Sequence, residues 1–324
     1  MNSPSKPSPS REGSSPVPPR AGQKSRQQGR RPGSSAGQGR RARQSTLRRR
    51  RNIMAAMAVA AVVIVVAVVV AVGLSSSSSQ KAAPRVPLTA SQEAHLTGVP
   101  LSTLVAASDT SAASHLIPAY QINAPAYTSG GKPQILYIGA EFCPICATER
   151  WPMVVALSQF GTFSHLSQSR SAVRDGNLAT LSFYGSSYTS QYLTFTAVET
   201  LTNVPKGNSY EPLQTPTPDQ VRLWTGVLGS ESYPFIYAGG KYVLDTYQYP
   251  ATVIEGRDFA QIAGAVGDNS TTVGASIDAS AAALVKYICG ITGQRPAATC
   301  QAVAAVKAPV TNVAQSGPSS SAND

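Results

Sequence analysis

The chain has 324 residues, of which 42% are hydrophobic, and its 27 Lys and Arg against 16 Asp and Glu give a formal net charge of +11. Residues 1–51 hold 14 of the 27 bases and one acid, Glu12, so the remaining chain is close to neutral. The basic character belongs to the N-terminal segment, and it therefore gives no evidence of a globular domain that binds nucleic acid.

Residues 1–51 consist largely of Ser, Pro, Gly, Gln and Arg and offer almost nothing to bury. Low hydrophobicity combined with high charge predicts a disordered tail. Its bases favour contact with anionic lipid at the inner leaflet, and nucleic acid is the alternative, with both interactions weakened by salt. The tail has no aromatic residue to stack on bases, so we expect no specific nucleic-acid partner.

An uncharged apolar run follows the tail, from Ile53 to Leu74. A helix of this length spans roughly 33 Å, enough to cross a hydrocarbon core of about 30 Å. We therefore expect a transmembrane helix over 52–74. The four arginines at 48–51 place the N-terminus in the cytoplasm and the rest of the chain outside the cell membrane. A cleaved secretion signal, whose apolar region is usually shorter, is the alternative.

The rest of the chain divides by composition. The Ser-rich residues 75–90 predict a flexible spacer, and the Ser, Ala and Asn end at 308–324 predicts a disordered tail. Between them, residues 91–307 are long enough for one α/β domain.

Two cysteines stand where a strand-like run meets a helix-like run. Residues 134–140 predict a buried strand, and 144–159 predict a helix, with Cys143 and Cys146 at its start. Cysteines at i and i+3 lie about 5 to 6 Å apart, within reach of a disulfide. A thiolate at a helix start is stabilised by unpaired N–H groups and by the helix dipole. We expect Cys143 to be the exposed nucleophile and Cys146 the resolving thiol.

Further elements alternate in the α/β manner. The pattern predicts strands at 178–185 and 192–199, a proline-rich break at 205–218, a helix at 219–228, a hairpin at 233–244 turning at Gly239-Gly240, and helices at 258–266 and 273–288.

All four cysteines fall on the predicted outer side of the membrane, where disulfides persist. An even number of cysteines favours two pairs. We interpret Cys289 and Cys300 as a structural disulfide that closes a short loop, and a second redox pair that relays electrons to Cys143 is the alternative. A zinc site made by all four cysteines is a third interpretation, which the oxidising compartment disfavours.

The run Ala-Glu-Phe-Cys-Pro-Ile-Cys at 140–146 is similar to the active-site motif of thioredoxins, and Pro152 lies near the position of the proline that kinks their active-site helix. Tyr233-Pro234 resembles their cis-proline loop, which packs beside the active-site sulfurs and offers its backbone to an extended substrate. The resemblance implies a thioredoxin-like fold with insertions. It also implies that a bound polypeptide would contact Phe142, Pro144, Ile145, Tyr233 and Pro234.

More closely, residues 137–151 resemble the membrane-anchored thioredoxin-like family catalogued as domain of unknown function 929. Further similar motifs lie at 156–163, 188–190 and 289–293, in the same order along the chain. The resemblance covers roughly residues 88–306 and implies the fold and the membrane anchor, whereas it assigns no reaction.

One position departs from the thioredoxin pattern. Thioredoxins have a buried Asp six residues before the first active-site cysteine, where this chain has Tyr137. Proton transfer then needs another group, and Glu141, Glu149 or a water molecule are the candidates. A surface ion pair between Glu149 and a neighbouring Arg is the alternative for that residue.

Together these features predict a membrane-anchored, extracytoplasmic thiol-disulfide oxidoreductase. Its expected partners are the lipid bilayer and envelope or secreted proteins with thiols or disulfides, and its expected chemistry needs no metal and no organic cofactor. The sequence leaves open the direction of electron flow and the redox partner. The alternative function is a non-catalytic scaffold or binding module with two structural disulfides.

Overall fold

The computed structural model describes residues 84–229 and 231–313. All described residues belong to one compact unit. The predicted basic tail, transmembrane helix, most of the spacer and the last eleven residues therefore lie outside the described residues.

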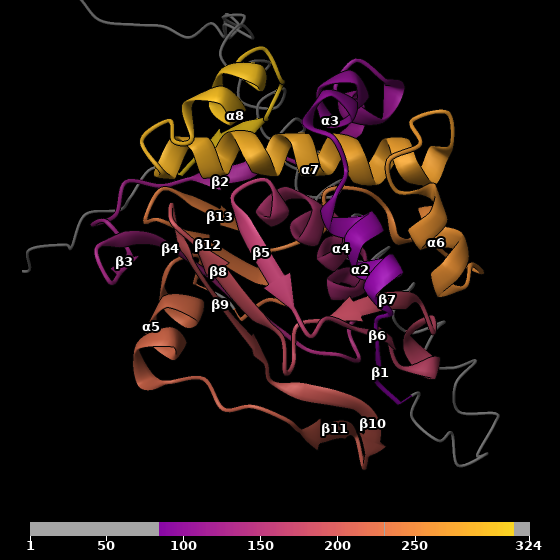
Figure 1. The fold of residues 1–324 in the computed structure, drawn as a ribbon. Coiled ribbons are helices and arrows are strands. Elements are labelled where there is room, and N and C mark those ends of the chain that lie inside the picture. Colours follow the sequence, from indigo (N-terminus) through magenta and orange to yellow (C-terminus); the bar gives the residue numbers. More distant parts are fainter. Residues whose placement is uncertain (1–83, 230, 314–324) are drawn as a thin grey trace, which may run out of the picture. The chain divides into compact units, whose positions relative to one another are not determined.

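The described chain is a mixed α/β structure with several sheets (Figure 1). Its helices are α2 (Ala90–Thr97), α3 (Leu101–Ala107), α4 (Pro144–Ser158), α5 (Pro218–Gly226), α6 (Phe259–Ala265), α7 (Thr272–Ile291) and α8 (Ala297–Ala302), with 3-10 turns η1 (Ser111–His115), η2 (Val173–Asp175) and η3 (Ala251–Val253). Its strands are β1 (Val86–Pro87), β2 (Ala119–Gln121), β3 (Thr128–Ser129), β4 (Lys132–Gly139), β5 (Gly161–Ser164), β6 (Ser167–Arg170), β7 (Ala179–Ser182), β8 (Ser187–Ser190), β9 (Thr194–Glu199), β10 (Leu201–Lys206), β11 (Ser209–Pro212), β12 (Phe235–Ala238), β13 (Tyr242–Leu244) and β14 (Val310–Asn312).

The main sheet is organised around β4. Its strand order is β14-β2-β13-β12-β4-β3, and β9 also pairs with β4. β12 runs antiparallel to β4 with Phe235 opposite Ile138, whereas β9 runs parallel to it with Glu199 opposite Gly139. The end of β4 therefore meets both the start of β12 and the end of β9. This register places Tyr233-Pro234 and Glu199 next to the loop that carries the cysteines.

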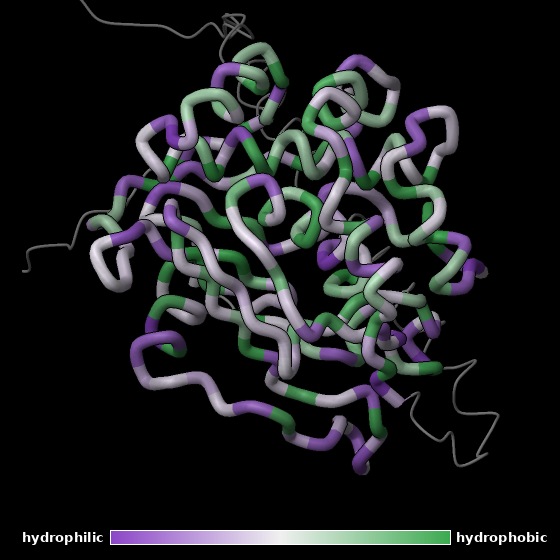
Figure 2. The backbone as a smooth tube through the Cα atoms, viewed as in Figure 1, coloured by the Kyte–Doolittle hydropathy of each residue, from purple (hydrophilic) through white to green (hydrophobic). Residues whose placement is uncertain are grey.

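The side chains of β4 alternate between two apolar layers. Ile135 and Tyr137 belong to the larger core, beneath α4 and α7, whereas Leu136 and Ile138 belong to a second core that includes Trp224 of α5. Figure 1 shows α7 lying across the sheet and α5 on the other side. Hydrophobic residues gather along the central strands, whereas the outlying β10–β11 hairpin is mostly hydrophilic (Figure 2). Burial on both faces explains why β4 is continuously apolar from Ile135 to its end.

Helix α7 is the element of the described chain with the length and composition to cross a membrane, but 83% of its most apolar window is buried inside the structure. It packs against α4 and α3. A central helix of a globular core meets the same criteria as a membrane span, so α7 gives only weak evidence for membrane insertion.

The sequence patterns for β4, α4, the β12–β13 hairpin and α6 are confirmed within one or two residues at each end. The prediction of a proline-rich break at 205–218 is wrong in part, because β10 and β11 form a hairpin there. Gly207 turns the chain with φ +58°, which a glycine adopts without steric cost. Pro205 stands opposite Tyr210 in a two-stranded ladder, where a missing N–H is tolerated at the edge.

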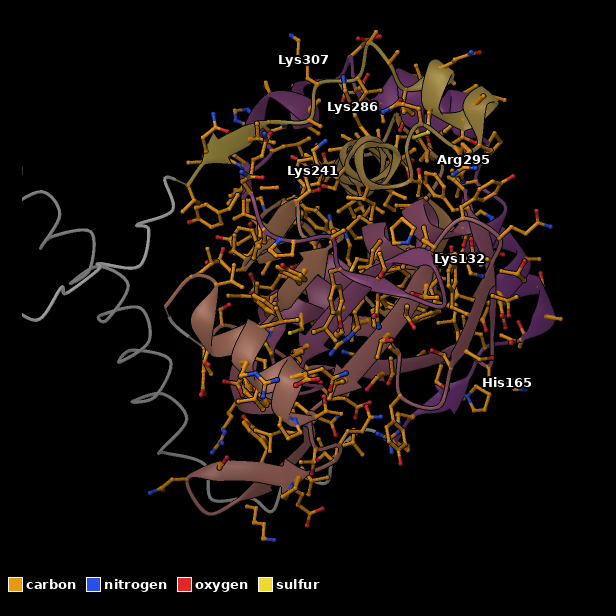
Figure 3. The ribbon with its side chains drawn as sticks, turned by 90° about the vertical axis from the view of Figure 1, so that its left-hand side faces the viewer. Lys132, His165, Lys241, Lys286, Arg295 and Lys307 are labelled. Carbon is orange, nitrogen blue, oxygen red and sulfur yellow. A yellow bond between two sulfur atoms is a disulfide. The ribbon has the colours of Figure 1, made fainter. Side chains whose placement is uncertain are left out.

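A disulfide between Cys289 and Cys300 joins the end of α7 to α8 and confirms the predicted pair. Both cysteines are buried, and their bond rules out a zinc site made by all four cysteines. Figure 3 shows α7 end-on with Lys241 and Lys286 beside it. The Lys241 ammonium donates to the Gly290 carbonyl at 3.4 Å, and that of Lys286 to the Ala304 carbonyl at 2.8 Å. These cations and the disulfide fasten the C-terminal end of α7.

The disulfide lies far from the other cysteine pair. Ile291, which ends α7, lies beside Gly239, and the Gly239 N–H donates to Gln134 near the start of β4. Cys143 and Cys146 follow the opposite end of that strand, which spans roughly 25 Å at about 3.3 Å per residue. This separation supports the structural interpretation of Cys289 and Cys300 over a direct relay.

We predict that replacing both Cys289 and Cys300 by Ser lowers the free energy of unfolding by about 3 kcal/mol, because the open loop restores entropy to the unfolded chain. Urea denaturation of wild type and variant under oxidising conditions measures the difference. Equal midpoints would contradict a stabilising role for this bond.

Candidate functional site

Cys143 caps the N-terminus of α4. Its backbone is extended, with φ −74° and ψ 125°, and Pro144 occupies the first helical position, where a missing N–H costs nothing. The Cys146 N–H donates to the Cys143 sulfur at 3.4 Å, and the Cys143 N–H donates to the Ala140 carbonyl at 3.2 Å. The sulfur therefore takes the place of the oxygen in an ordinary helix cap.

A cis peptide bond lies against the same sulfur. The Tyr233-Pro234 bond is cis, as the resemblance to thioredoxins implies. The Cys143 thiol donates to the Tyr233 carbonyl at 3.6 Å. Thr200 holds the Tyr233 ring through a hydrogen bond of 2.7 Å to its hydroxyl. The start of β12 thus places a backbone carbonyl within contact of the first cysteine.

The expectation that Cys143 is exposed is wrong. Cys143 is 5% exposed and Cys146 is 0% exposed, and both are free thiols. The Phe142 ring next to them stacks on Tyr210 at 4.2 Å between ring centroids, with the planes 8° apart. Tyr210 comes from the β10–β11 hairpin, so a segment remote in sequence covers the cysteine loop.

The two thiols have opposite pKa shifts. The hydrogen bond from the Cys146 thiol is the largest cause that lowers the pKa of Cys143, and the Cys146 N–H and the Arg150 charge lower it further against the effect of burial. Burial is the largest cause that raises the pKa of Cys146 well above its ordinary value. At neutral pH the first cysteine is therefore the more readily ionised, which is the asymmetry that a nucleophile and a resolving thiol require.

A buried ion pair lies beneath the loop. Arg150 of α4 and Glu199 of β9 are both 0% exposed. Nε and Nη2 of Arg150 donate to the two carboxylate oxygens of Glu199 at 2.9 and 2.8 Å, and Nη2 also donates to the Ala140 carbonyl at 2.9 Å. Burial raises the pKa of Glu199, and the guanidinium opposes that rise. The bidentate geometry fits a charged carboxylate.

The sequence reasoning missed this pair. Arg150 follows Cys146 by four positions and precedes Val154 by four, so it lies on the buried face of α4. That spacing was the available signal for Arg150. Glu199 ends a strand and has no comparable signal in the sequence.

Tyr137 fills the position of the thioredoxin Asp. Its ring lies along β4 over Gly139, where a Cβ would come within 2.2 Å of the Tyr137 hydroxyl oxygen. Burial is the largest cause that raises the pKa of Tyr137 well above 10, and nearby Cys146 adds to the rise whereas Arg150 opposes it. The phenol therefore stays protonated at neutral pH and acts as a donor, not as a base.

The structure places the two acidic candidates for proton transfer differently. Glu141 is 2% exposed and accepts hydrogen bonds from Arg85 at 3.0 Å and from Ser182 at 2.6 Å. Glu149 is 0% exposed and accepts from the Gln248 N–H at 3.2 Å, so the surface ion pair considered for it is wrong. The hydrogen bonds described for these two carboxylates do not include either cysteine, and their role in proton transfer stays a prediction.

The residues expected to contact a substrate lie around the thiols. Phe142, Ile145 and Tyr233 pack against the small cluster that contains both cysteines. Phe142, Pro144, Ile145 and Tyr233 are half-buried, and Pro234 is buried. The structure thus brings these five residues together around Cys143, under the β10–β11 hairpin.

Residues 118–210 match the sequence profile of the family described as Domain of unknown function (DUF929). The match includes β4, the cysteine loop and α4, and it confirms the family resemblance over this segment. Comparisons with curated proteins and with solved structures found no match.

Replacing Tyr210 by Ala should speed alkylation of Cys143 by iodoacetamide roughly three- to ten-fold, because an aromatic pair contributes about 0.5 to 1.5 kcal/mol to keeping the site closed. Mass spectrometry of the modified cysteine measures the rate. Tyr127→Ala, near the start of β4, is the control and should leave the rate unchanged. An unaltered rate in Tyr210→Ala would contradict the covering role of the hairpin.

Glu149 should make stability depend on pH. Burial raises its pKa to about 8 from 4.5. Its proton is then held more tightly in the folded than in the unfolded state, so its stabilising effect is complete below about pH 4.5 and is lost as pH rises through about 8. Between pH 5 and 9, wild type should lose on the order of 3 to 5 kcal/mol relative to Glu149→Gln. Urea denaturation at both pH values measures this, and exposed Glu255→Gln is the control. Parallel pH curves for wild type and Glu149→Gln would refute the assignment.

Proposed function

We propose, from the premise that residues 118–210 belong to this family, that the chain is a thiol-disulfide oxidoreductase of envelope or secreted proteins. One observation carries the proposal. The Cys143 sulfur caps a helix, accepts the Cys146 N–H at 3.4 Å and contacts the carbonyl before a cis-proline at 3.6 Å. This arrangement combines a stabilised thiolate, a resolving thiol and a backbone acceptor for a substrate chain.

A thioredoxin-like architecture is part of the proposal. It is supported by a central strand that leads into a Cys-Pro-Ile-Cys helix start and by an antiparallel strand that begins just after a cis-proline. The segments outside the described residues complete the proposal. The apolar run at 52–74 would anchor the protein in the lipid bilayer, and the basic tail would keep the N-terminus in the cytoplasm.

The proposed exchange uses the two sulfur atoms. A thiolate attacks a disulfide sulfur, the old S–S bond breaks, and the released sulfur leaves as a thiolate. With Cys143 as the attacking group, a substrate disulfide becomes a mixed disulfide, and Cys146 then attacks the Cys143 sulfur and releases the reduced substrate. Two electrons pass from the cysteine pair to the substrate, and the reverse sequence oxidises substrate thiols. The sulfur atoms carry both steps without a metal or an organic cofactor.

A polypeptide is the substrate that this surrounding fits. Tyr233 precedes the cis-proline and is half-buried, and its neighbour Phe142 offers an aromatic face beside the sulfur. An extended chain could pair with backbone groups here as in strand addition. Substrate entry requires the β10–β11 hairpin to move, because Tyr210 covers Phe142.

The burial of Cys143 favours a second candidate function. A thiol that is 5% exposed would also suit a non-catalytic scaffold whose cysteines serve packing and whose surface binds a partner. In that case the pair would resist exchange under native conditions.

We expect the Cys143–Cys146 pair to equilibrate with a glutathione redox buffer at neutral pH. Cys143→Ser should abolish exchange, and Cys146→Ala should accumulate mixed disulfides because the resolving thiol is gone. Mass spectrometry after acid quenching measures both results. The Cys289→Ser/Cys300→Ser variant is the control and should exchange normally. A pair that stays unreactive in the folded protein would favour the scaffold.

A further inference from the structure

Two buried donors lie beside the cysteine pair: Nη1 of Arg150 has no hydrogen-bond partner among the described residues, and the hydroxyl of Tyr137 interacts with Cys146. Both side chains are 0% exposed. A buried donor without a partner is unfavourable, because it has lost its hydrogen bonds to water and gained none in the protein. A negative charge on the neighbouring sulfurs, which offsets the charge of the buried guanidinium, is therefore favoured over a pair without charge.

Arg150 is held in one orientation. Nε and Nη2 of Arg150 donate to the Glu199 carboxylate, and Nη2 also donates to the Ala140 carbonyl. Nη1 is the remaining donor of this guanidinium. The same Ala140 carbonyl accepts the N–H of Cys143 at 3.2 Å. One oxygen atom thus connects the guanidinium to the backbone of the cysteine loop.

Charged and titratable groups act on the sulfurs from four elements, namely Tyr137 of β4, Arg150 of α4, Glu199 of β9 and Tyr233 before β12. Of these four described groups, Arg150 is the one that carries a positive charge. By contrast, Lys241, Arg295 and Lys307 are exposed (Figure 3). The thiol pair therefore meets a fixed, desolvated positive charge, and water screens that charge little.

The reduced and oxidised pairs differ in what they can accept. A thiolate accepts charge-assisted hydrogen bonds, whereas the sulfur atoms of a disulfide are weak acceptors without charge. The guanidinium and the phenol therefore favour the reduced, ionised pair.

Building on the proposed exchange function, we propose that Arg150, clamped by Glu199, is a positioning residue that stabilises the reduced cysteine pair and makes the protein a donor of disulfides to polypeptide thiols. The substrates are then exported chains with reduced cysteines. A stabilised reduced form raises the reduction potential, so electrons flow from the substrate to the cysteine pair.

The donor reaction balances as follows. A substrate thiolate attacks the Cys143 sulfur of the Cys143–Cys146 disulfide, and Cys146 leaves as a thiolate and takes up a proton. A second substrate thiolate attacks the substrate sulfur of the mixed disulfide, forms the substrate disulfide and releases Cys143 as a thiolate. Two electrons reach the cysteine pair. A low-molecular-weight disulfide, oxidised glutathione in the test below, returns the pair to its oxidised form.

A purely structural role for the ion pair makes a different prediction. Breaking a buried pair from one side strongly destabilises a protein, because it leaves an uncompensated buried charge. A structural role would lower the stability of each variant without shifting the potential in a direction set by the sign of the charge removed.

The experiment measures the redox equilibrium constant with glutathione for the full-length chain in mild detergent. The variants are Arg150→Met, Glu199→Gln, the double variant Arg150→Met/Glu199→Gln, and Tyr137→Phe, which removes a donor and leaves the ring. The double variant leaves no unpaired buried charge and keeps the test valid if Arg150→Met does not fold. Alkylation of Cys143 across pH gives the thiol pKa independently.

We expect opposite shifts. Glu199→Gln should favour the reduced pair, because less negative charge opposes Arg150, whereas the double variant should disfavour it roughly ten-fold, which corresponds to about 30 mV. The redox equilibrium constant of Arg150→Met should change by at least as much as that of the double variant. That of Tyr137→Phe should change in the same direction by a smaller factor. The pKa of Cys143 should fall in Glu199→Gln and rise in Arg150→Met and in the double variant.

Shifts of the same sign in Glu199→Gln and the double variant, or unchanged potentials in both, would overturn the inference. This outcome differs from failure of the proposed function. If the wild-type pair does not equilibrate with glutathione at all, the exchange function fails, whereas the alkylation profile still reports whether Arg150 sets the thiol pKa.

Discussion

The structure around the cysteines depends on the buried ion pair between Arg150 and Glu199. It joins the first turns of α4 to the end of β9, and through the Ala140 carbonyl it also fixes the loop between β4 and α4. Removing both charges from water is costly, and the two are retained only because the bidentate geometry satisfies most of their hydrogen bonds. The contiguous loop and helix α4 are thereby held against the end of β9, which lies 49 residues further along the chain at Glu199, at the point where the sulfurs lie. A hydrophobic contact would join the same elements without presenting a charge to the thiols.

The position of this charge is set by the strand register. β4 ends at Gly139 opposite Glu199, and β12 begins opposite Ile138. The cysteine loop therefore emerges between an acid on one side and a cis-proline on the other. Gly139 has a separate requirement, because a side chain there would collide with the Tyr137 hydroxyl. The same short stretch of β4 thus places the phenol, the loop and the ion pair together.

The sequence predicted what local patterns determine. The apolar run of β4, the proline at the start of α4 and the glycine pair between β12 and β13 each specify an element within a few residues, and the disulfide followed from compartment and parity. The ion pair was not predicted because its partners are 49 residues apart and a charged helix position is ordinarily solvated. The burial of Cys143 was not predicted because Tyr210 covers the loop from the β10–β11 hairpin. The prolines of that segment indicated a break in place of a hairpin. These misses concern contacts between distant segments, which periodicity does not encode.

The proposed exchange would take place beside a phenol and a clamped guanidinium, whereas the resemblance to thioredoxins implies a buried acid at that place. A carboxylate can take the proton of a resolving thiol, whereas Tyr137 and Arg150 can only donate. Forward and reverse exchange pass through the same transition state, so stabilising that state alone would speed both directions equally. Tyr137 and Arg150 are instead proposed to act on the end states, since the reduced pair offers an anion and the disulfide does not. Cover by the β10–β11 hairpin strengthens this preference, because exclusion of water increases the effect of a fixed charge on a nearby thiolate. Burial of Cys143 is therefore compatible with redox chemistry, provided that the hairpin opens for the substrate.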